Sequence, residues 1–267
     1  MRALKFLGPQ DSVSAGGVVF PCGVVTCVTD PWWEAHRALL SPVQFEDREA
    51  TVNDVRPQHI TYSDDRYTGS ITAVIVNFRT PGLIRDAVIS LKMVYPDLAL
   101  TAVDNGSGDG ASVDVICELA ERFAAITPVF LPHNEGHGPP MHRAMMEAKT
   151  DLAFTMDSDV IVRRGGFLER METRLREAGL YAIGPIWWRD WYNDNHYLSP
   201  VAGLYDLAVY RTLPPFEHAP DIAQTNMREA QRRGLKVEDF PIFDYLWHIE
   251  QGTRGRYGSA WDLTGVA

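Results

Sequence analysis

From residue 71 onward, short apolar runs alternate with longer stretches in which apolar residues recur every three or four positions. Residues 71–77 form a β-branched apolar run that predicts a buried strand. Pro81 then opens a stretch in which Ile84, Val88 and Leu91 line one face of a helix. Further strands are expected at residues 98–103, 128–131 and 152–156, each followed by helical periodicity. This succession predicts an α/β fold with a mostly parallel, doubly wound sheet.

The first 70 residues follow a different pattern. They contain short β-rich runs at residues 18–20 and 24–28, and a short helix is expected at residues 31–40. Residues 64–70 are polar and typical of a linker. The sequence therefore predicts a small β-rich N-terminal unit with its linker, residues 1–70, followed by a larger α/β domain, residues 71–267.

The overall charge of the chain indicates which kinds of binding partner are disfavoured. A formal net charge of −10 disfavours broad electrostatic binding to nucleic acid or to an anionic membrane surface, and favours a small, specific substrate. No apolar run is long enough to span a bilayer, and the N-terminus lacks the apolar stretch of a signal peptide. The three cysteines, an odd number, argue against a disulfide framework. A cytoplasmic location is expected.

Polar residues stand at the expected ends of four strands: Asn77, Asp104, Asn134 and Asp157. In open α/β sheets, ligands bind beyond the carboxyl ends of the strands. These four positions, which are distant in sequence, are therefore expected to share one rim of the sheet.

The triplet Asp157-Ser158-Asp159 follows the fourth strand directly. Carboxylates this close repel each other unless a cation or a shared proton lies between them. Hard divalent ions such as Mg²⁺ or Mn²⁺ suit carboxylate oxygens and take further ligands from water and phosphates. The triplet is the candidate metal site.

Four motifs in chain order resemble those of family 2 glycosyltransferases, which have the Rossmann-like, nucleotide-sugar-binding GT-A fold. The motifs are residues 74–79, 103–110, 134–138 and 154–159, and the resemblance extends from residue 71 to about residue 252. It implies a nucleoside diphosphate sugar as donor and Mn²⁺ or Mg²⁺ as cofactor.

The resemblance implies roles on the donor side of the reaction. Asp157 and Asp159 would hold the metal, with His248 completing the ligand shell. The nucleotide sugar would be bound by Asn77, Arg79, Asp104, Asn134, Gly136, Gly138, Asp157 and Ser158. Structural alternatives stay open, because Asp104 can cap the Asn-Gly turn that follows it, residues 134–138 can simply connect two elements, and His248 can be packed among aromatic residues.

On the acceptor side, the resemblance implies a carboxylate before a late helix, and Asp221 precedes the helical stretch 222–234. In an inverting transfer, this carboxylate takes the proton from the acceptor hydroxyl as the hydroxyl attacks the sugar. Asp221 could instead cap the helix. Glu217 is the alternative base, and His218 a weaker one.

Residues 187–197 are dense in aromatic side chains, which can stack on sugar rings beside carboxylates that bind hydroxyls. A loop over the acceptor is expected here, although the tryptophans could instead pack on the sheet. The expected acceptor-binding residues are Trp187, Trp188, Asp190, Trp191 and Asp194.

The sequence thus predicts an inverting, Mn²⁺- or Mg²⁺-dependent glycosyltransferase. Its acceptor hydroxyl could belong to a glycan, a lipid-linked sugar, a protein or a modified DNA base. One alternative is a catalytically silent nucleotide-sugar-binding module, and another is a phage-type enzyme that glycosylates a modified DNA base. A sugar-nucleotide pyrophosphorylase is disfavoured, because no Gly-x-Gly-Thr-Arg loop follows the first strand of the α/β domain.

Overall fold

A computed structural model describes residues 70–187, 197–217 and 222–249, together with the backbone of five strands between residues 2 and 49. The chain divides into two compact units, Met1–Thr61 and Tyr62–Ala267. The helix expected at residues 31–40 lies outside the described residues, as does the expected linker up to residue 69.

The N-terminal unit consists of antiparallel strands. Three of them form a sheet in the order β4-β1-β5, and the other two pair as a hairpin. The strands are β1 (Arg2–Phe6), β2 (Ser12–Ala15), β3 (Val18–Pro21), β4 (Val25–Val28) and β5 (Phe45–Glu49). The β-rich runs expected at residues 18–20 and 24–28 correspond to β3 and β4.

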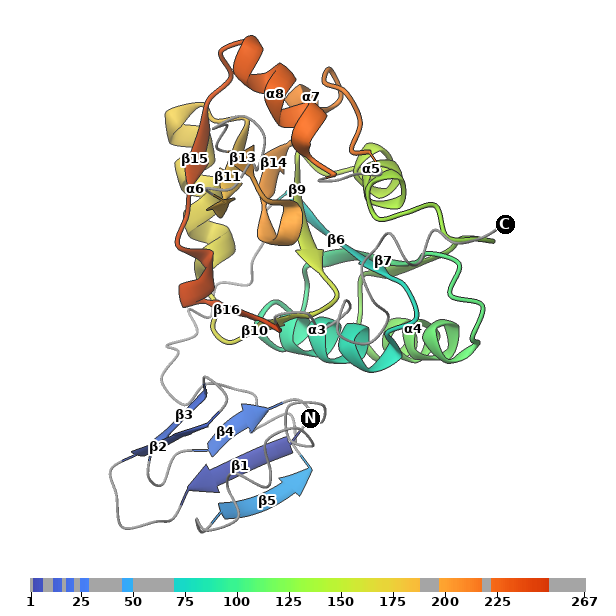
Figure 1. Cartoon of the computed structure of the whole chain (residues 1–267), viewed down its shortest axis with the longest axis vertical. Helices are drawn as coiled ribbons and strands as arrows, with labels where there is room; N and C mark the ends of the chain where they lie inside the picture. The colour runs from blue at the N-terminus through green and yellow to red at the C-terminus, as the bar shows by residue number, and fades with distance from the viewer. Residues whose placement is uncertain are drawn as a thin grey trace. The chain divides into compact units, whose positions relative to one another are not determined.

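The second unit is built on a seven-stranded sheet in the order β15-β11-β14-β9-β6-β7-β8 (Figure 1). Its strands are β6 (Ile71–Asn77), β7 (Ala99–Asp104), β8 (Ile126–Phe130), β9 (Leu152–Asp157), β11 (Ala182–Gly184), β14 (Leu204–Asp206) and β15 (Val237–Asp239). All adjacent pairs are parallel except those made by β14, which runs antiparallel to both β9 and β11. The mostly parallel α/β sheet expected from the sequence is confirmed.

Strand β6 shows why an unbroken apolar run belongs at the centre of this sheet. All seven of its residues are buried. Successive side chains of a strand point to opposite faces. Ile71, Ala73 and Ile75 accordingly join the core on one face, while Val74 and Val76 join the core on the other.

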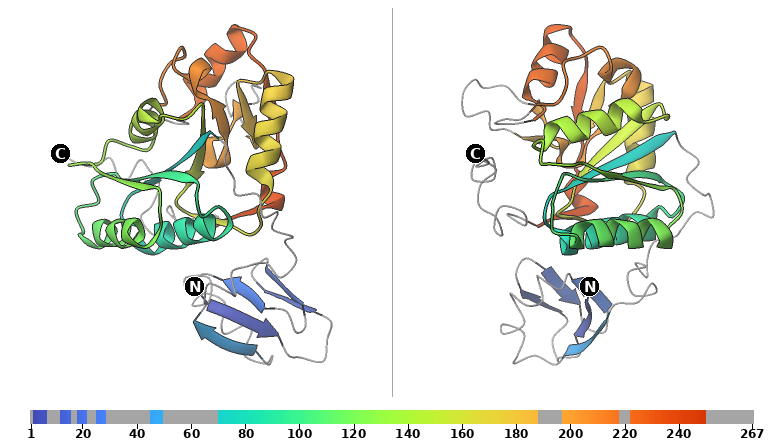
Figure 2. Two further views of the ribbon diagram at one scale, coloured as in Figure 1. Left: turned by 180° about the vertical axis from the view of Figure 1, so that it is seen from behind. Right: turned by 90° about the vertical axis from the view of Figure 1, so that its right-hand side faces the viewer.

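Helices cover both faces of the sheet, as the two views of Figure 2 show. The first core includes α3 (Pro81–Val94), α4 (Ala111–Arg122) and α6 (Phe167–Ala178). The second includes α5 (Gly138–Glu147), α7 (Leu207–Tyr210) and α8 (Gln224–Arg232). No helix among the described residues is long and apolar enough to cross a membrane.

Short elements complete the unit. Strands β10 (Val160–Val162) and β16 (Leu246–His248) pair antiparallel, as do β12 (Ile186–Trp187) and β13 (Tyr197–Leu198). Two 3-10 turns are η1 (Pro200–Ala202) and η2 (Ile242–Asp244). The pairing of β10 with β16 matters for the site, because it joins the end of the described chain to the segment that follows β9.

Candidate active site

Two carboxylates and an imidazole meet at the carboxyl end of β9. Ligand atoms of Asp157, Asp159 and His248 all lie within 4.8 Å of one another. Nε2 of His248 is 3.3 Å from Oδ1 of Asp159. The structure therefore brings together the three residues for which a shared metal site is expected.

Backbone pairing holds His248 in this position. Strand β10 begins one residue after Asp159, and Val160 lies opposite His248 in the register of β10 with β16. The amide of Ile249 also donates to the carbonyl of Asp159 over 2.9 Å. Asp159 is only 7% exposed, and Ser158 is buried beside it. The backbone hydrogen bonds between these two strands therefore fix the position of His248 relative to Asp159.

This donor set fits a divalent cation. Two oxygen ligands and one imidazole nitrogen suit Mn²⁺ or Mg²⁺ better than a thiolate-preferring metal, and the neighbouring carboxylates repel each other without a positive charge between them. Asp157 is the more accessible carboxylate, with 28% of its side chain exposed against 10% for Asp159. Of the two carboxylates, Asp157 is therefore the one that solvent reaches more readily.

A second histidine contacts the cluster. Nε2 of His137 lies 3.4 Å from Oδ1 of Asp157, and His137 stands at the N-cap of α5. Two other histidines, His133 and His142, stand close to it in the sequence. No local signal distinguishes the three, because the contact depends on how the loop turns back towards β9.

At the ends of β6 and β7, unlike at the end of β9, the polar side chains form a hydrogen-bonded network. Nδ2 of Asn77 donates to Oδ1 of Asp104 over 3.2 Å, and Oγ1 of Thr80 donates to Oδ1 of Asn77 over 2.7 Å. The amide of Ser107 donates to Oδ2 of Asp104 over 3.0 Å, and its hydroxyl donates to Oδ1 of the same carboxylate. Arg79, with a positive φ of 54°, donates from its amide to Oγ of Ser107 over 2.8 Å. Asp104 therefore caps the turn that follows it, whatever else it contacts.

Asn134 has a similar part in the next loop. Its Oδ1 accepts from the amide of Gly136 over 2.9 Å and from Nδ2 of Asn105 over 2.9 Å. Gly136 has a φ of 79°, in the left-handed region that glycine adopts without strain. These bonds fix the path of residues 134–138.

Gly138 is needed for close packing between two segments. A Cβ on this residue would lie 2.0 Å from the carbonyl oxygen of Glu217. The start of α5 and the segment of Glu217 can therefore approach this closely only with glycine at this position. Binding of the nucleotide sugar by Gly138 stays a prediction. The segment containing Glu217 is thereby held against the start of α5.

Glu217 itself is exposed, and its Oε2 accepts from Oγ1 of Thr225 over 2.8 Å. Its amide donates to the carbonyl of Ile222 over 3.0 Å, which closes the connection into α8. Of the other acceptor-side residues, Trp187 is described only by its backbone, in β12. Outside the described residues lie Trp188, Asp190, Trp191, Asp194, His218 and Asp221.

Comparison with known proteins shows a family match and similar structures for this chain. Residues 72–228 match the family described as glycosyl transferase family 2. The structure is similar to mannosyltransferase PcManGT from Pyrobaculum calidifontis in complex with GDP-Man and Mn²⁺, with 18% identity and a TM-score of 0.55, covering 66% of this chain and 55% of that one. It is also similar to S. aureus TarS 1-349, with 15% identity and a TM-score of 0.54, covering 68% and 61% respectively. No curated protein matches significantly.

At these identities, the two structures support the GT-A fold, and this chain spans 55% and 61% of their lengths. The family match is independent of them and covers more than half of the 267 residues. The resemblance stated from the four sequence motifs is confirmed. The chain belongs to glycosyl transferase family 2.

Proposed function

We propose that this chain is an inverting, metal-dependent glycosyltransferase that moves a sugar from a nucleoside diphosphate sugar to an acceptor hydroxyl. The observation that carries the proposal is the convergence of Asp157, Asp159 and His248 within 4.8 Å. PcManGT, a protein of the same fold that is described with GDP-Man and Mn²⁺, supports a nucleotide sugar and a divalent metal.

In this proposal, Asp159 and His248 hold Mn²⁺ or Mg²⁺, and Asp157 contributes its more exposed carboxylate. A bound cation supplies positive charge to the diphosphate as it departs. Asn77 and Asp104 keep the neighbouring turn in the shape that borders the nucleotide. The loop of Asn134 and Gly136 does the same for the sugar side of the donor.

The acceptor hydroxyl must lose a proton as it attacks the anomeric carbon of the donor sugar. We assign this proton to the carboxylate of Asp221, with Glu217 as the alternative base. Glu217 supports a base in this region, because its backbone lies against Gly138 at the start of α5, next to the residue that contacts Asp157. Direct attack by the acceptor inverts the anomeric centre.

The test is to incubate the purified chain with Mn²⁺ and a panel of UDP- and GDP-sugars and to measure released nucleoside diphosphate. We expect release with one of these donors, its loss with a chelator, and its recovery with Mn²⁺ or Mg²⁺. NMR of the transferred sugar should show the anomeric configuration opposite to that of the donor. Binding of a nucleotide sugar without any release would instead support the silent module.

The two candidate bases can be separated by paired variants. Asp221→Asn should lower the transfer rate roughly 10²- to 10⁴-fold, the range for loss of a general base, while nucleotide-sugar binding is kept. Glu217→Gln should stay within about threefold of the unmodified chain on the same scale. The opposite ranking of the two variants would assign the base to Glu217.

A further inference from the structure

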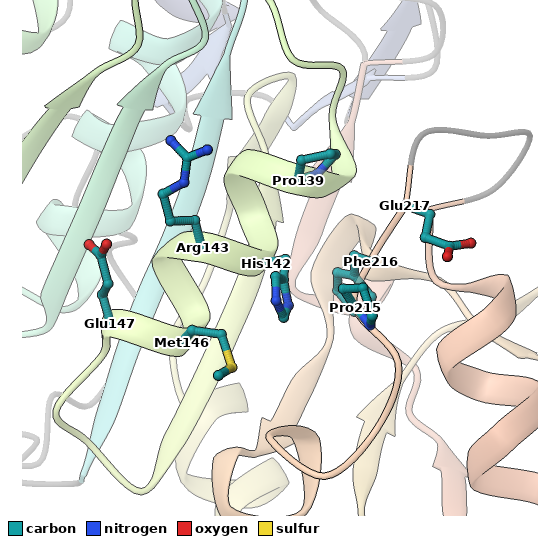
Figure 3. Close-up of a pocket in the computed structure, with 8 residues that line it drawn as sticks. All are labelled: Pro139, His142, Arg143, Met146, Glu147, Pro215, Phe216 and Glu217. Carbon is teal, nitrogen blue, oxygen red and sulfur yellow. The ribbon is translucent and has the colours of Figure 1, made fainter.

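A groove follows the side of α5 that does not pack on the sheet, opposite the segment before α8 (Figure 3). Its volume of about 780 Å³ is within the range of ordinary small-molecule sites. Residues at helical spacing line one wall, and a short segment lines the other: Pro139, His142, Arg143, Met146 and Glu147, then Pro215, Phe216 and Glu217.

One end of the groove lies near the candidate active site. Glu217, at one end, lies against Gly138, and the adjacent His137 is 3.4 Å from Asp157. Met146 and Glu147 lie at the other end, two turns further along α5 (Figure 3). A molecule that reaches the site beside Glu217 can therefore continue along the helix.

The lining combines an apolar strip with hydrogen-bonding groups. Met146 is 41% exposed, one of three exposed large hydrophobic side chains among the described residues, and Figure 3 shows it and His142 directed towards Pro215 and Phe216. Burial lowers the pKa of His142, so its ring is neutral at pH 7. Such a surface suits sugar rings, which present C–H faces as well as hydroxyls.

The charge of the groove disfavours a phosphate-bearing molecule. Glu147 and Glu217 are among the residues that line it, and the guanidinium of Arg143 is already paired with Glu135 over 2.6 Å, so the charge around the groove is negative. Carboxylates accept hydrogen bonds from hydroxyls but repel phosphates. A nucleic-acid or phosphorylated polymer would therefore bind poorly here.

We propose that this groove binds the acceptor, and that the acceptor is a neutral saccharide chain whose units beyond the reacting hydroxyl lie along α5. The inference rests on the proposed function and assigns its acceptor class. Longer chains should be better acceptors than monosaccharides, because additional units can occupy the groove towards Met146.

The test uses the full chain with Mn²⁺, the donor that it turns over, and neutral oligosaccharides of one to four units. Acceptor KM should fall with chain length. Met146→Trp, which fills the groove, should raise the KM for the longer acceptors roughly tenfold with little change for monosaccharides. Phe243→Trp is the matched control, since Phe243 is 43% exposed and outside the groove. It should leave KM unchanged.

Donor hydrolysis without acceptor and direct saccharide binding by NMR separate this inference from the proposed function. If the donor is hydrolysed but Met146→Trp leaves every acceptor KM and saccharide affinity unchanged, the groove assignment is wrong. Preference for DNA or a phosphorylated acceptor would also overturn it. If no donor is hydrolysed, the proposed function fails, and the NMR measurement alone decides whether neutral saccharides bind at Met146.

Discussion

At the carboxyl end of β9, two carboxylates and an imidazole converge, whereas at the ends of β6 and β7 the polar side chains bond to one another and to the turns that follow. Asp159 lies 3.3 Å from His248. Asp104, by contrast, accepts hydrogen bonds from the side chain of Asn77 and from the amide and hydroxyl of Ser107. Asp104 is the last residue of β7, Asp159 lies just beyond the end of β9 in the same sheet, and both are buried.

The difference lies in what neutralises each carboxylate. Around Asp104 the protein itself supplies donors, so the group stabilises the fold of its turn. Asp157 and Asp159 contact His137 and His248, but here the protein also brings two carboxylates together, an arrangement that a divalent cation stabilises. Position at a strand end therefore marks the rim, and the neighbouring groups show which carboxylate stabilises a turn and which lies among other metal-ligating side chains. Binding of the nucleotide by Asp104 stays a prediction.

The largest expected effect comes from the metal cluster. Asp159→Asn should lower turnover roughly 1,000-fold, because loss of metal assistance costs several kcal/mol at the transition state. Its melting temperature should change little, because the variant removes a repulsion between carboxylates while Asn keeps an oxygen towards His248. Asp151→Asn is the control, since Asp151 precedes the opposite end of β9 and its side chain is 72% exposed. Equal activity in the two variants would contradict the assignment.

Removing Asp104 from the hydrogen-bonded network at the ends of β6 and β7 should lower the stability of the fold. Asp104→Ala leaves the donors of Asn77 and Ser107 without their acceptor and should lower the free energy of unfolding by about 2 kcal/mol. Urea denaturation measures this loss. Asp114→Ala, at an exposed position on α4, should lie within about 0.5 kcal/mol of the unmodified chain. Unchanged stability of Asp104→Ala, with loss of nucleotide binding, would make Asp104 a ligand residue rather than part of the frame.

His137, at the N-cap of α5, contacts the metal cluster through Asp157. His137→Phe keeps a ring but removes the nitrogen 3.4 Å from Asp157, and should weaken Mn²⁺ binding about tenfold, as expected for a group that orients a metal ligand. His137→Gln, which keeps a donor, should recover most of the affinity measured by Mn²⁺ titration. His133→Phe, at an exposed position in the same loop, should change nothing. Equal affinities in His133→Phe and His137→Phe would remove His137 from the site.

The smallest expected effect concerns Lys92, a buried ammonium group whose hydrogen-bond partners are also supplied by the protein. Nζ of Lys92 donates to the carbonyls of Leu98 over 2.5 Å and Ala124 over 2.7 Å. Burial lowers its pKa from 10.5 to about 8, although Asp97 opposes the shift. The unfolded chain therefore binds more protons above pH 8, and stability should rise with pH.

Urea denaturation between pH 8 and 9.5 checks this slope, below the range in which tyrosines ionise in the unfolded chain. Lys92→Met should flatten it. An equal slope in both proteins would assign the pH dependence to other groups.

The frame of the fold was predictable because its central strands are buried on both faces. Such strands read as unbroken apolar runs, and residues 71–77 coincide with β6. Strand β14 has only three residues, and its antiparallel placement between β9 and β11 depends on tertiary packing. The mixed character of the sheet could therefore not be predicted.

For the site, strand ends placed Asp104 and Asp157 on one rim, but they did not reveal which donors surround each. His248 joins Asp159 only because β16 pairs with β10, and His137 reaches Asp157 only after the turn at Gly136. Such long-range contacts leave no periodic pattern in the sequence. The same holds for Gly138, whose partner is the backbone of Glu217.

The most direct test of the central claim is the position of Mn²⁺ in crystals of the chain grown with a nucleoside diphosphate, located by anomalous scattering. The account predicts one strong peak bonded to Asp159 and His248, beside Asp157, with a diphosphate oxygen in its coordination shell. A peak elsewhere, with the diphosphate bound away from these residues, would contradict it.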